Sequence, residues 1–188
     1  RPSAHPLLVL ITYPIRKLLR KLAVPTVIAQ LFDILYNIVD RIYIGHIPGD
    51  GDLALTGVGV CLPLILIVSA FAALVASGGA PRASIYMGKQ DHNTAEKILG
   101  GCFALQVCIS AVLTAVLLLW SKDLLLAFGA SENTIPYAVD YMRIYAIGTI
   151  FVQMTLGLNS FITAQGFAQI GMRTVLIGAV SNIVLDPI

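Results

Sequence analysis

Long apolar stretches separated by short polar segments run along the whole sequence. Four of these stretches reach the roughly 20 residues that an α-helix needs to cross the hydrocarbon core of a bilayer. A fifth is shorter, because the sequence stops inside it. The predicted spans are residues 22–44, 53–77, 98–120, 135–163 and 174–188. The pattern therefore predicts an all-α, polytopic helical bundle in a membrane.

The composition agrees with a membrane protein. Hydrophobic residues make up 57% of the 188 residues and charged residues only 12%, with a mean hydropathy of +0.86. Soluble domains carry about 25% charged residues. The first residue is not Met and the last one follows Asp186 and Pro187 directly, so we expect a piece of a longer protein. Cys61, Cys102 and Cys108 lie in apolar stretches, which indicates neither disulfides nor a metal cluster.

The basic residues that flank the spans lie almost entirely on one side of the predicted bundle. The connections on the opposite side, residues 46–52 and 121–134, contain Lys122 as their only Lys or Arg. Cytoplasmic connections carry the excess of Lys and Arg in membrane proteins. The N-terminus is therefore predicted to be cytoplasmic, with residues 1–21 forming a cytoplasmic segment. The basic residues on that side are Arg16, Lys17, Arg20, Lys21, Arg82, Lys89, Lys97 and Arg173.

A polar stripe marks the first predicted span. At about 100° per residue, Gln30, Asp33, Asn37 and Asp40 project within roughly 80° of one another on a helix. A carboxylate at the centre of a membrane helix costs about 2.5–3.5 kcal/mol. We therefore expect the stripe to face protein or a water-filled cavity, where such groups serve ion or proton relays and substrate pathways.

Two further polar sets are predicted on other spans. Asn182 and Asp186 are four residues apart on the fifth span and share a helix face. Tyr141, Tyr145 and Asn159 project within about 40° of one another on the fourth span. Carboxylate, amide and phenol oxygens suit a hard cation such as sodium, and a buried carboxylate can instead carry a proton.

Structural interpretations of these acids stay open at this point. Asp40 could pair with Arg41 or Arg143 in place of binding an ion, and Asp33 could merely line a vestibule nearer the cytoplasm. His92 and Glu96 are four residues apart but lack a second His, so we interpret them as the solvated start of the third helix.

Enzymatic and nucleic-acid signatures are missing from the sequence. The glycine pairs follow no strand, so they make no phosphate-binding loop. The basic residues at the predicted membrane boundary are typical of topological anchors more than of a nucleic-acid surface. We therefore expect no enzymatic activity and no nucleic-acid partner.

Several stretches resemble the multidrug and toxic compound extrusion (MATE) transporters. The first span, LAVPTVIAQLFDILYNIVDRIYIG, is similar to the first helix of that family. Similarity continues in MGKQDHNTAEKILG, in LLLAFGASENTIPYAVDYMRIYAIG and in the closing NIVLDPI. The resemblance covers nearly everything from residue 18 to residue 188, and the pairing of a first-span Asp with NIVLDPI is fairly specific to the family.

The resemblance implies an exporter with twelve spans in two pseudo-symmetric six-helix lobes. Residues 22–188 would form most of the N-terminal lobe, ending inside its fifth helix. Family members resembling this chain expel organic cations in exchange for inward-moving sodium or protons. The coupling site of the branch with an acidic N-lobe cavity corresponds to Asp40, Tyr141, Asn159, Asn182 and Asp186.

We assign two roles on the strength of this resemblance. Asp40, Asn182 and Asp186 would hold sodium if sodium is the coupling ion. Gln30, Asp33, Tyr36 and Asn37 would line the substrate cavity, although Asp33 is an extra acid outside the usual family pattern.

The resulting hypothesis is a secondary active multidrug exporter. It would be a monomer in the bacterial inner (plasma) membrane, using sodium or protons and no other cofactor, with small cationic drugs and the lipid bilayer as partners. The alternatives are a flippase of lipid-linked precursors from the same superfamily and a non-transporting receptor or scaffold. The buried acids have no evident purpose in a receptor.

Overall fold

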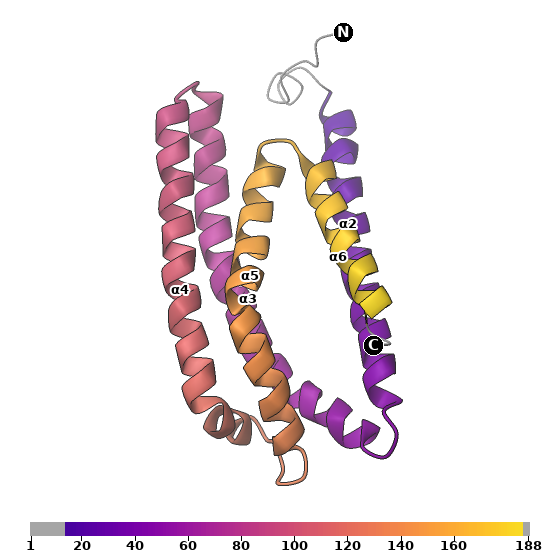
Figure 1. Ribbon diagram of the computed structural model, residues 1–188. Coiled ribbons are helices and arrows are strands. Elements are labelled where there is room, and N and C mark those ends of the chain that lie inside the picture. The colour runs from indigo at the N-terminus through magenta and orange to yellow at the C-terminus, as the bar shows by residue number, and fades with distance from the viewer. Residues whose placement is uncertain (1–13, 186–188) are drawn as a thin grey trace. The chain divides into compact units, whose positions relative to one another are not determined.

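The described part of the chain, residues 14–185 of a computed structural model, is built from five α-helices without a strand (Figure 1). All five are long and apolar enough to cross a membrane, which confirms the predicted all-α fold. Asp186, a member of the predicted coupling site, lies outside the described residues, as do residues 1–13. The helices are α2 (Ile15–Gly45), α3 (Gly51–Gly88), α4 (His92–Ala127), α5 (Ile135–Ala164) and α6 (Ala168–Leu185).

Several helix ends differ from the predicted spans. Helix α2 begins at Ile15 and not at residue 22, α3 continues to Gly88 and not only to residue 77, and α6 begins at Ala168 and not at residue 174. The predictions followed the edges of apolar stretches. A helix satisfies its own backbone hydrogen bonds and therefore continues through polar residues until a turn interrupts it.

A residue with positive φ lies in each turn between the described helices. These residues are Gly49 (φ 92°), Gln90 (φ 63°), Gly129 (φ 97°) and Gly166 (φ 89°). Glycine adopts this conformation without steric cost, which explains three of the four positions. The connections between helices are consequently short.

Asp91 fixes the start of α4. The backbone amide of Thr94 donates a hydrogen bond of 3.0 Å to Asp91 Oδ1, as in a helix N-cap. The Thr94 side chain and backbone both donate to the charged carboxylate, which lowers the pKa of Asp91 below its ordinary value. This cap places His92 and Glu96 on the first turns of the helix.

Helix α4 contains a kink near its other end. Trp120 has non-helical backbone angles (φ −118°, ψ 16°), and a short helical piece follows it as far as Ala127. Leu125 in this piece is completely buried in the hydrophobic core. The kink thus lets Leu125 pack against core residues of α3 and α5.

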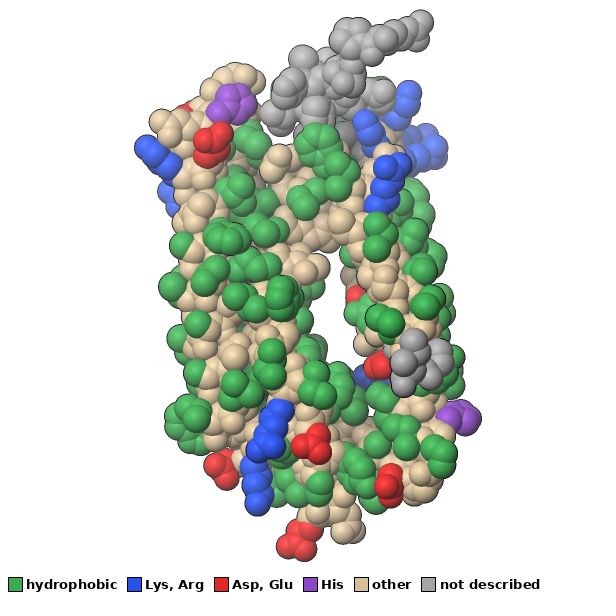
Figure 2. All heavy atoms as spheres, in the orientation of Figure 1, with side chains coloured by type: hydrophobic (Ala, Val, Ile, Leu, Met, Phe, Trp, Pro, Cys, Tyr) green, Lys and Arg blue, Asp and Glu red, His purple; other side chains and the backbone are tan. Residues whose placement is uncertain are grey.

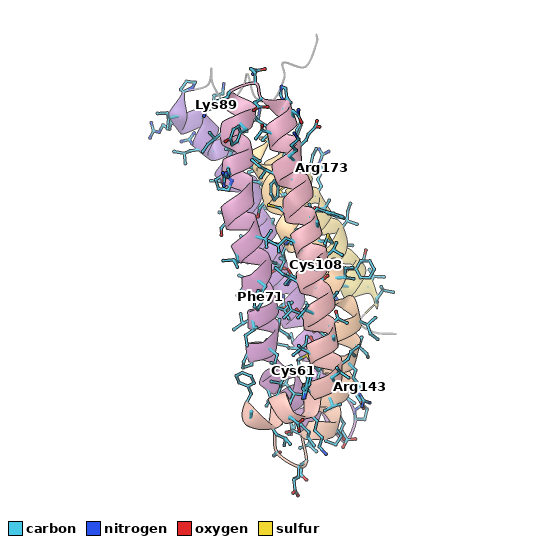
Figure 3. All side chains as sticks on the ribbon, turned by 90° about the vertical axis from the view of Figure 1, so that its left-hand side faces the viewer. Cys61, Phe71, Lys89, Cys108, Arg143 and Arg173 are labelled. Carbon is cyan, nitrogen blue, oxygen red and sulfur yellow. The ribbon has the colours of Figure 1, made fainter. Side chains whose placement is uncertain are left out.

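The chain forms two compact units. The first unit comprises Arg1–Tyr43, Gly79–Leu99 and Asn159–Ile188, and the second comprises Ile44–Gly78 and Gly100–Leu158. Helices α3 and α4 run side by side in the second unit, with Cys61 on α3 and Cys108 on α4 (Figure 3). The buried core of this unit consists of Cys61, Leu64, Val68, Leu117, Leu125, Ala138, Met142 and Ala146.

Polar side chains connect the helices of the second unit through backbone carbonyls. Gln153 on α5 donates from Nε2 to the Val68 carbonyl on α3 at 2.8 Å. Thr114 on α4 donates to the Ala146 carbonyl on α5 at 3.0 Å. Such bonds contribute to helix association in lipid, where burial of apolar side chains offers no driving force.

The outer flanks of the helices are apolar. On the face shown in Figure 2, hydrophobic side chains cover the flanks of the helices, and most Lys and Arg side chains lie toward helix ends. Ile144 and Phe151 on α5 are 76% and 72% exposed. Such exposure is costly in water and favourable against lipid chains. This distribution is that of membrane-spanning helices.

Gly57 allows α3 to approach α5 closely, and we predict that Gly57→Ala destabilises the fold. A Cβ atom at this position would lie 3.1 Å from the Ala138 amide nitrogen and 3.2 Å from the Thr134 carbonyl oxygen. Overpacking of this kind costs about 1–3 kcal/mol. The full-length variant should therefore lose thermal stability in detergent.

Gly59→Ala is the matched control, because a Cβ at Gly59 would meet nothing within 4 Å. Equal melting temperatures for the two variants would show that the α3–α5 contact does not limit stability.

Candidate functional site

The predicted polar stripe lies on α2, in the first unit. Asp33, Tyr36 and Asp40 are half-buried, whereas Gln30 and Asn37 are exposed. The helix is continuous through all five residues. The shared helix face that the sequence predicted is therefore present, and the two carboxylates lie on its more buried part.

Asp33 belongs to a local network on this helix. The Tyr36 phenol lies close enough to the Asp33 carboxylate and the Asn37 side chain to interact with both. Asn37 Nδ2 also donates to the Asp33 backbone carbonyl at 2.7 Å. Asp40 lies close enough to interact electrostatically with Tyr36. Tyr36 thus lies within electrostatic reach of both acids, which helical phase alone did not indicate.

Arg41 is not a structural counterion for the stripe. Its side chain is exposed, and no ion pair involving Arg41 is found among residues 14–185. The sequence left open a pairing of Asp40 with Arg41, and the structure does not support it.

Asn159 packs against a glycine of the neighbouring helix. Its Oδ1 atom, on α5, lies so close to Gly171 on α6 that a Cβ at position 171 would overlap it. Gly171 is buried, and both residues belong to the first unit. The Asn159 Oδ1 atom is buried and has no hydrogen-bond partner among the described residues.

Asn182 on α6 shares this property. It is half-buried in the first unit, and its Oδ1 atom is also buried without a hydrogen-bond partner in the part of the chain that is described. Buried amide oxygens are nearly always paired. Three are unpartnered among the described residues: those of Asn159 and Asn182 in the first unit, and that of Gln153 in the second. Amide oxygens are suitable ligands for a hard cation or a protonated group.

The predicted coupling residues are distributed over both units. Asp40, Asn159 and Asn182 lie in the first unit, whereas Tyr141 packs against the core of the second unit. Asp186 lies outside the described residues. That all five residues form one site stays a prediction.

Comparisons with known proteins agree with the helical architecture. A crystal structure of MATE in the straight conformation superposes with a TM-score of 0.87 at 22% identity. The match covers 100% of this chain and 40% of the solved one. Multidrug export protein MepA of Staphylococcus haemolyticus is 25% identical over 172 residues, covering 92% of this chain and 38% of MepA. An FAD transporter of Shewanella oneidensis is 23% identical over 179 residues, covering 95% of this chain and 39% of the relative.

The fold and the polar helix faces define a multi-pass helical membrane protein. The MatE family model matches residues 25–188, and the chain belongs to this family. The chain spans about two-fifths of the length of the curated relatives it matches.

Gly171→Ala should disturb the site without unfolding the protein. The new Cβ would displace the end of the Asn159 side chain, which can rotate away, so the backbone need not move. Disturbing the orientation of a side chain that binds an ion typically lowers the affinity for the ion about 10–100-fold. Under the exporter hypothesis from the sequence, the full-length variant should lose about tenfold in cation-dependent drug efflux at matched membrane levels.

Gly178→Ala on the same helix is the control, since a Cβ there would meet nothing within 4 Å. Unchanged efflux by Gly171→Ala would show that the position of Asn159 is not critical.

Proposed function

We propose that the full-length protein is a secondary active exporter of organic cations, driven by the inward movement of sodium or protons. The observation that carries this proposal is the pair of buried, unpartnered amide oxygens of Asn159 and Asn182 in the same unit as Asp40. Membership of the MatE family and similarity to a multidrug export protein support it.

The proposed mechanism depends on the charge of the acids. Asp40 and Asp186 would bind the coupling ion, with Asn159, Asn182 and Tyr141 as neutral partners. A bound proton or sodium ion neutralises carboxylate charge and thereby changes the free energy of each conformation of the transporter. A ligand that binds one conformation more tightly shifts the population toward it, which is the basis of alternating access.

The substrate would bind along the stripe on α2. Asp33 supplies a second negative charge, and Asn37 Nδ2 donates to the Asp33 backbone carbonyl at 2.7 Å. Exposed Gln30 and Asn37 add polar contacts. Two acids on one helix attract a cationic drug and disfavour an anionic cargo. This charge argues against a lipid-phosphate flippase and against a flavin nucleotide as the preferred substrate.

We predict that Asp40→Asn and Asp186→Asn each abolish drug efflux by the full-length protein. Membrane insertion should not suffer, because a buried carboxylate at mid-helix costs about 2.5–3.5 kcal/mol and the amide relieves that cost. Ethidium accumulation in cells with matched protein levels measures the effect.

Asp140→Asn is the control for these two variants, because Asp140 is exposed on α5. Normal efflux by both site variants would refute a coupling role for the two acids.

The protein is further proposed to reside in the bacterial inner membrane with a cytoplasmic N-terminus. A cysteine introduced at Lys89 should react with an impermeant reagent only from the cytoplasm, and one at Asp50 only from outside, because basic residues stay on the cytoplasmic side. Both positions are exposed, so both should react. Labelling from the opposite sides would reverse the proposed topology.

The coupling ion is proposed to be sodium or a proton, in competition for one site. Carboxylate and amide oxygens can coordinate sodium, and either carboxylate can be protonated instead. Proteoliposomes containing the full-length protein should transport drug with an imposed sodium gradient at fixed pH, and also with a proton gradient in the absence of sodium. Transport driven by only one gradient would exclude a shared site while leaving cation-coupled export intact.

A further inference from the structure

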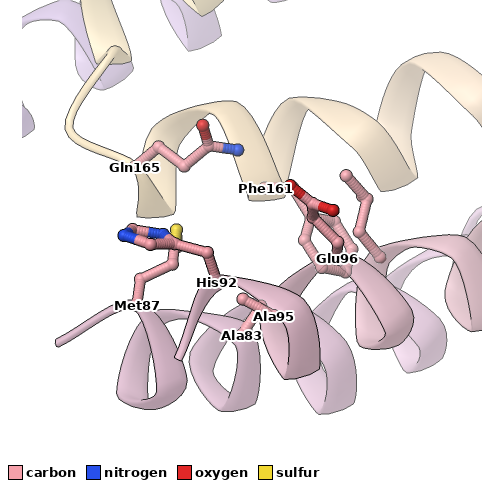
Figure 4. A pocket seen from close by; sticks show the side chains of 8 residues that line it. Ala83, Met87, His92, Ala95, Glu96, Phe161 and Gln165 are labelled. Atoms are coloured by element: carbon pink, nitrogen blue, oxygen red, sulfur yellow. The ribbon is translucent and has the colours of Figure 1, made fainter. Parts of the chain in front are cut away.

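A second group of polar side chains lies in the first unit, on helices other than α2. A cavity of about 220 Å³ opens between the end of α3, the first turns of α4 and the end of α5 (Figure 4). Its principal lining residues are Ala83, Met87, His92, Glu96, Phe161 and Gln165.

Local structure explains why these side chains converge. Asp91 caps α4, so that His92 and Glu96, four residues apart, emerge on one face of the first turns. Ala83 and Ala95, only 2% and 6% exposed, form the floor and leave room for a ligand above them. The sequence predicted a solvated helix start here. His92 and Glu96 are indeed exposed, but they also line the cavity.

The chemistry of the lining is that of a cation site with an aromatic wall. Phe161 is 4% exposed, and Figure 4 shows the Glu96 carboxylate beside its ring. Gln165 extends over the same space from the turn after α5. Among the described residues, no hydrogen bond or ion pair engages the Glu96 carboxylate or the Gln165 side-chain amide. Both groups are therefore available to a ligand.

We propose that this cavity binds a small organic ammonium group. Glu96 supplies the negative charge, Phe161 offers its ring for a cation–π contact, and Met87 contributes a polarisable wall. A hard inorganic cation requires several converging oxygens, and the lining supplies few besides those of Glu96 and Gln165. The negative charge of Glu96 disfavours anions.

The size of the cavity limits the ligand. Pockets for drug-sized molecules usually measure about 300–1,000 Å³. The smaller volume here suits a compact amine or the ammonium head of a larger molecule. None of the lining residues belongs to the stripe on α2 or to the predicted coupling set, so the site does not depend on the proposed export function.

Cysteine protection in the purified full-length protein tests the proposal. Leu99, which also lines the cavity, is replaced by cysteine in a background in which the partly buried Cys102 and the exposed Cys108 are serine. The thiol is modified with neutral methyl methanethiosulfonate, with choline chloride or an equal concentration of sodium chloride present. Choline should slow the modification, whereas sodium should not. A cysteine at Lys89, outside the cavity lining, is the reporter control and should show no protection.

Two lining variants then identify the groups that bind choline. Glu96→Gln should weaken the apparent affinity for choline about fivefold, as expected for a partly exposed charge pair. Phe161→Leu should weaken it about threefold by removing the cation–π contact. Glu96→Asp, which keeps the charge, should retain more of the protection than Glu96→Gln. Comparable modification rates without choline show that the variants keep the cavity folded.

Three outcomes would overturn the proposal: no protection by choline, equal protection by sodium, or full protection in both Glu96→Gln and Phe161→Leu. Asp40→Asn separates this site from the proposed export site. That variant should lose drug efflux yet keep choline protection at Leu99→Cys. Loss of protection in Asp40→Asn would assign the choline effect to the coupling site and refute a separate ammonium site.

Discussion

Polar groups inside a bilayer have no water with which to form hydrogen bonds, and this constraint governs the architecture of the protein. A helix satisfies its backbone groups internally, which explains why the described spans are all helical. Polar side chains must then find partners on their own or neighbouring helices. Thr114 and Gln153 do so by donating to carbonyls of other helices. These bonds connect helices that lipid alone would not press together.

Close backbone approach is the second consequence of the same constraint. Gly57 lets α3 lie against the start of α5, and Gly171 makes room for Asn159. Cys61 on α3 donates to the Ala138 carbonyl on α5 at 3.4 Å. Dispersion contacts and weak polar bonds of this kind increase as helices approach. Small residues therefore serve packing at some positions and the placement of a polar side chain at others.

Some exceptions to the constraint lie in the unit where we propose that function resides, whereas Gln106 Nε2 and Gln153 Oε1 are unpartnered in the second unit. Asn159 and Asn182 leave buried amide oxygens unpartnered among the described residues, and the acids of α2 lie half-buried in a membrane-spanning helix. A fold that served only stability would pair or remove these groups. The cavity beside Phe161 is a separate case at the solvated start of α4, where Glu96 and Gln165 have no partners among the described side chains. The two proposed sites differ in chemistry: carboxylate and amide oxygens in one, a carboxylate and an aromatic ring in the other.

The sequence by itself determined the features that depend on local pattern. Apolar stretch length predicted five spanning helices, helical phase placed Asp33 and Asp40 on one face, and four sequence motifs indicated the family. Helix ends were less predictable, because turns at Gln90 and Gly166 and the cap at Asp91 decide them, and not polarity. Only the tertiary structure placed Gly171 against Asn159 and Phe161 beside Glu96. Such contacts join residues distant in sequence, and periodicity records which face a side chain occupies but not which neighbour that face meets.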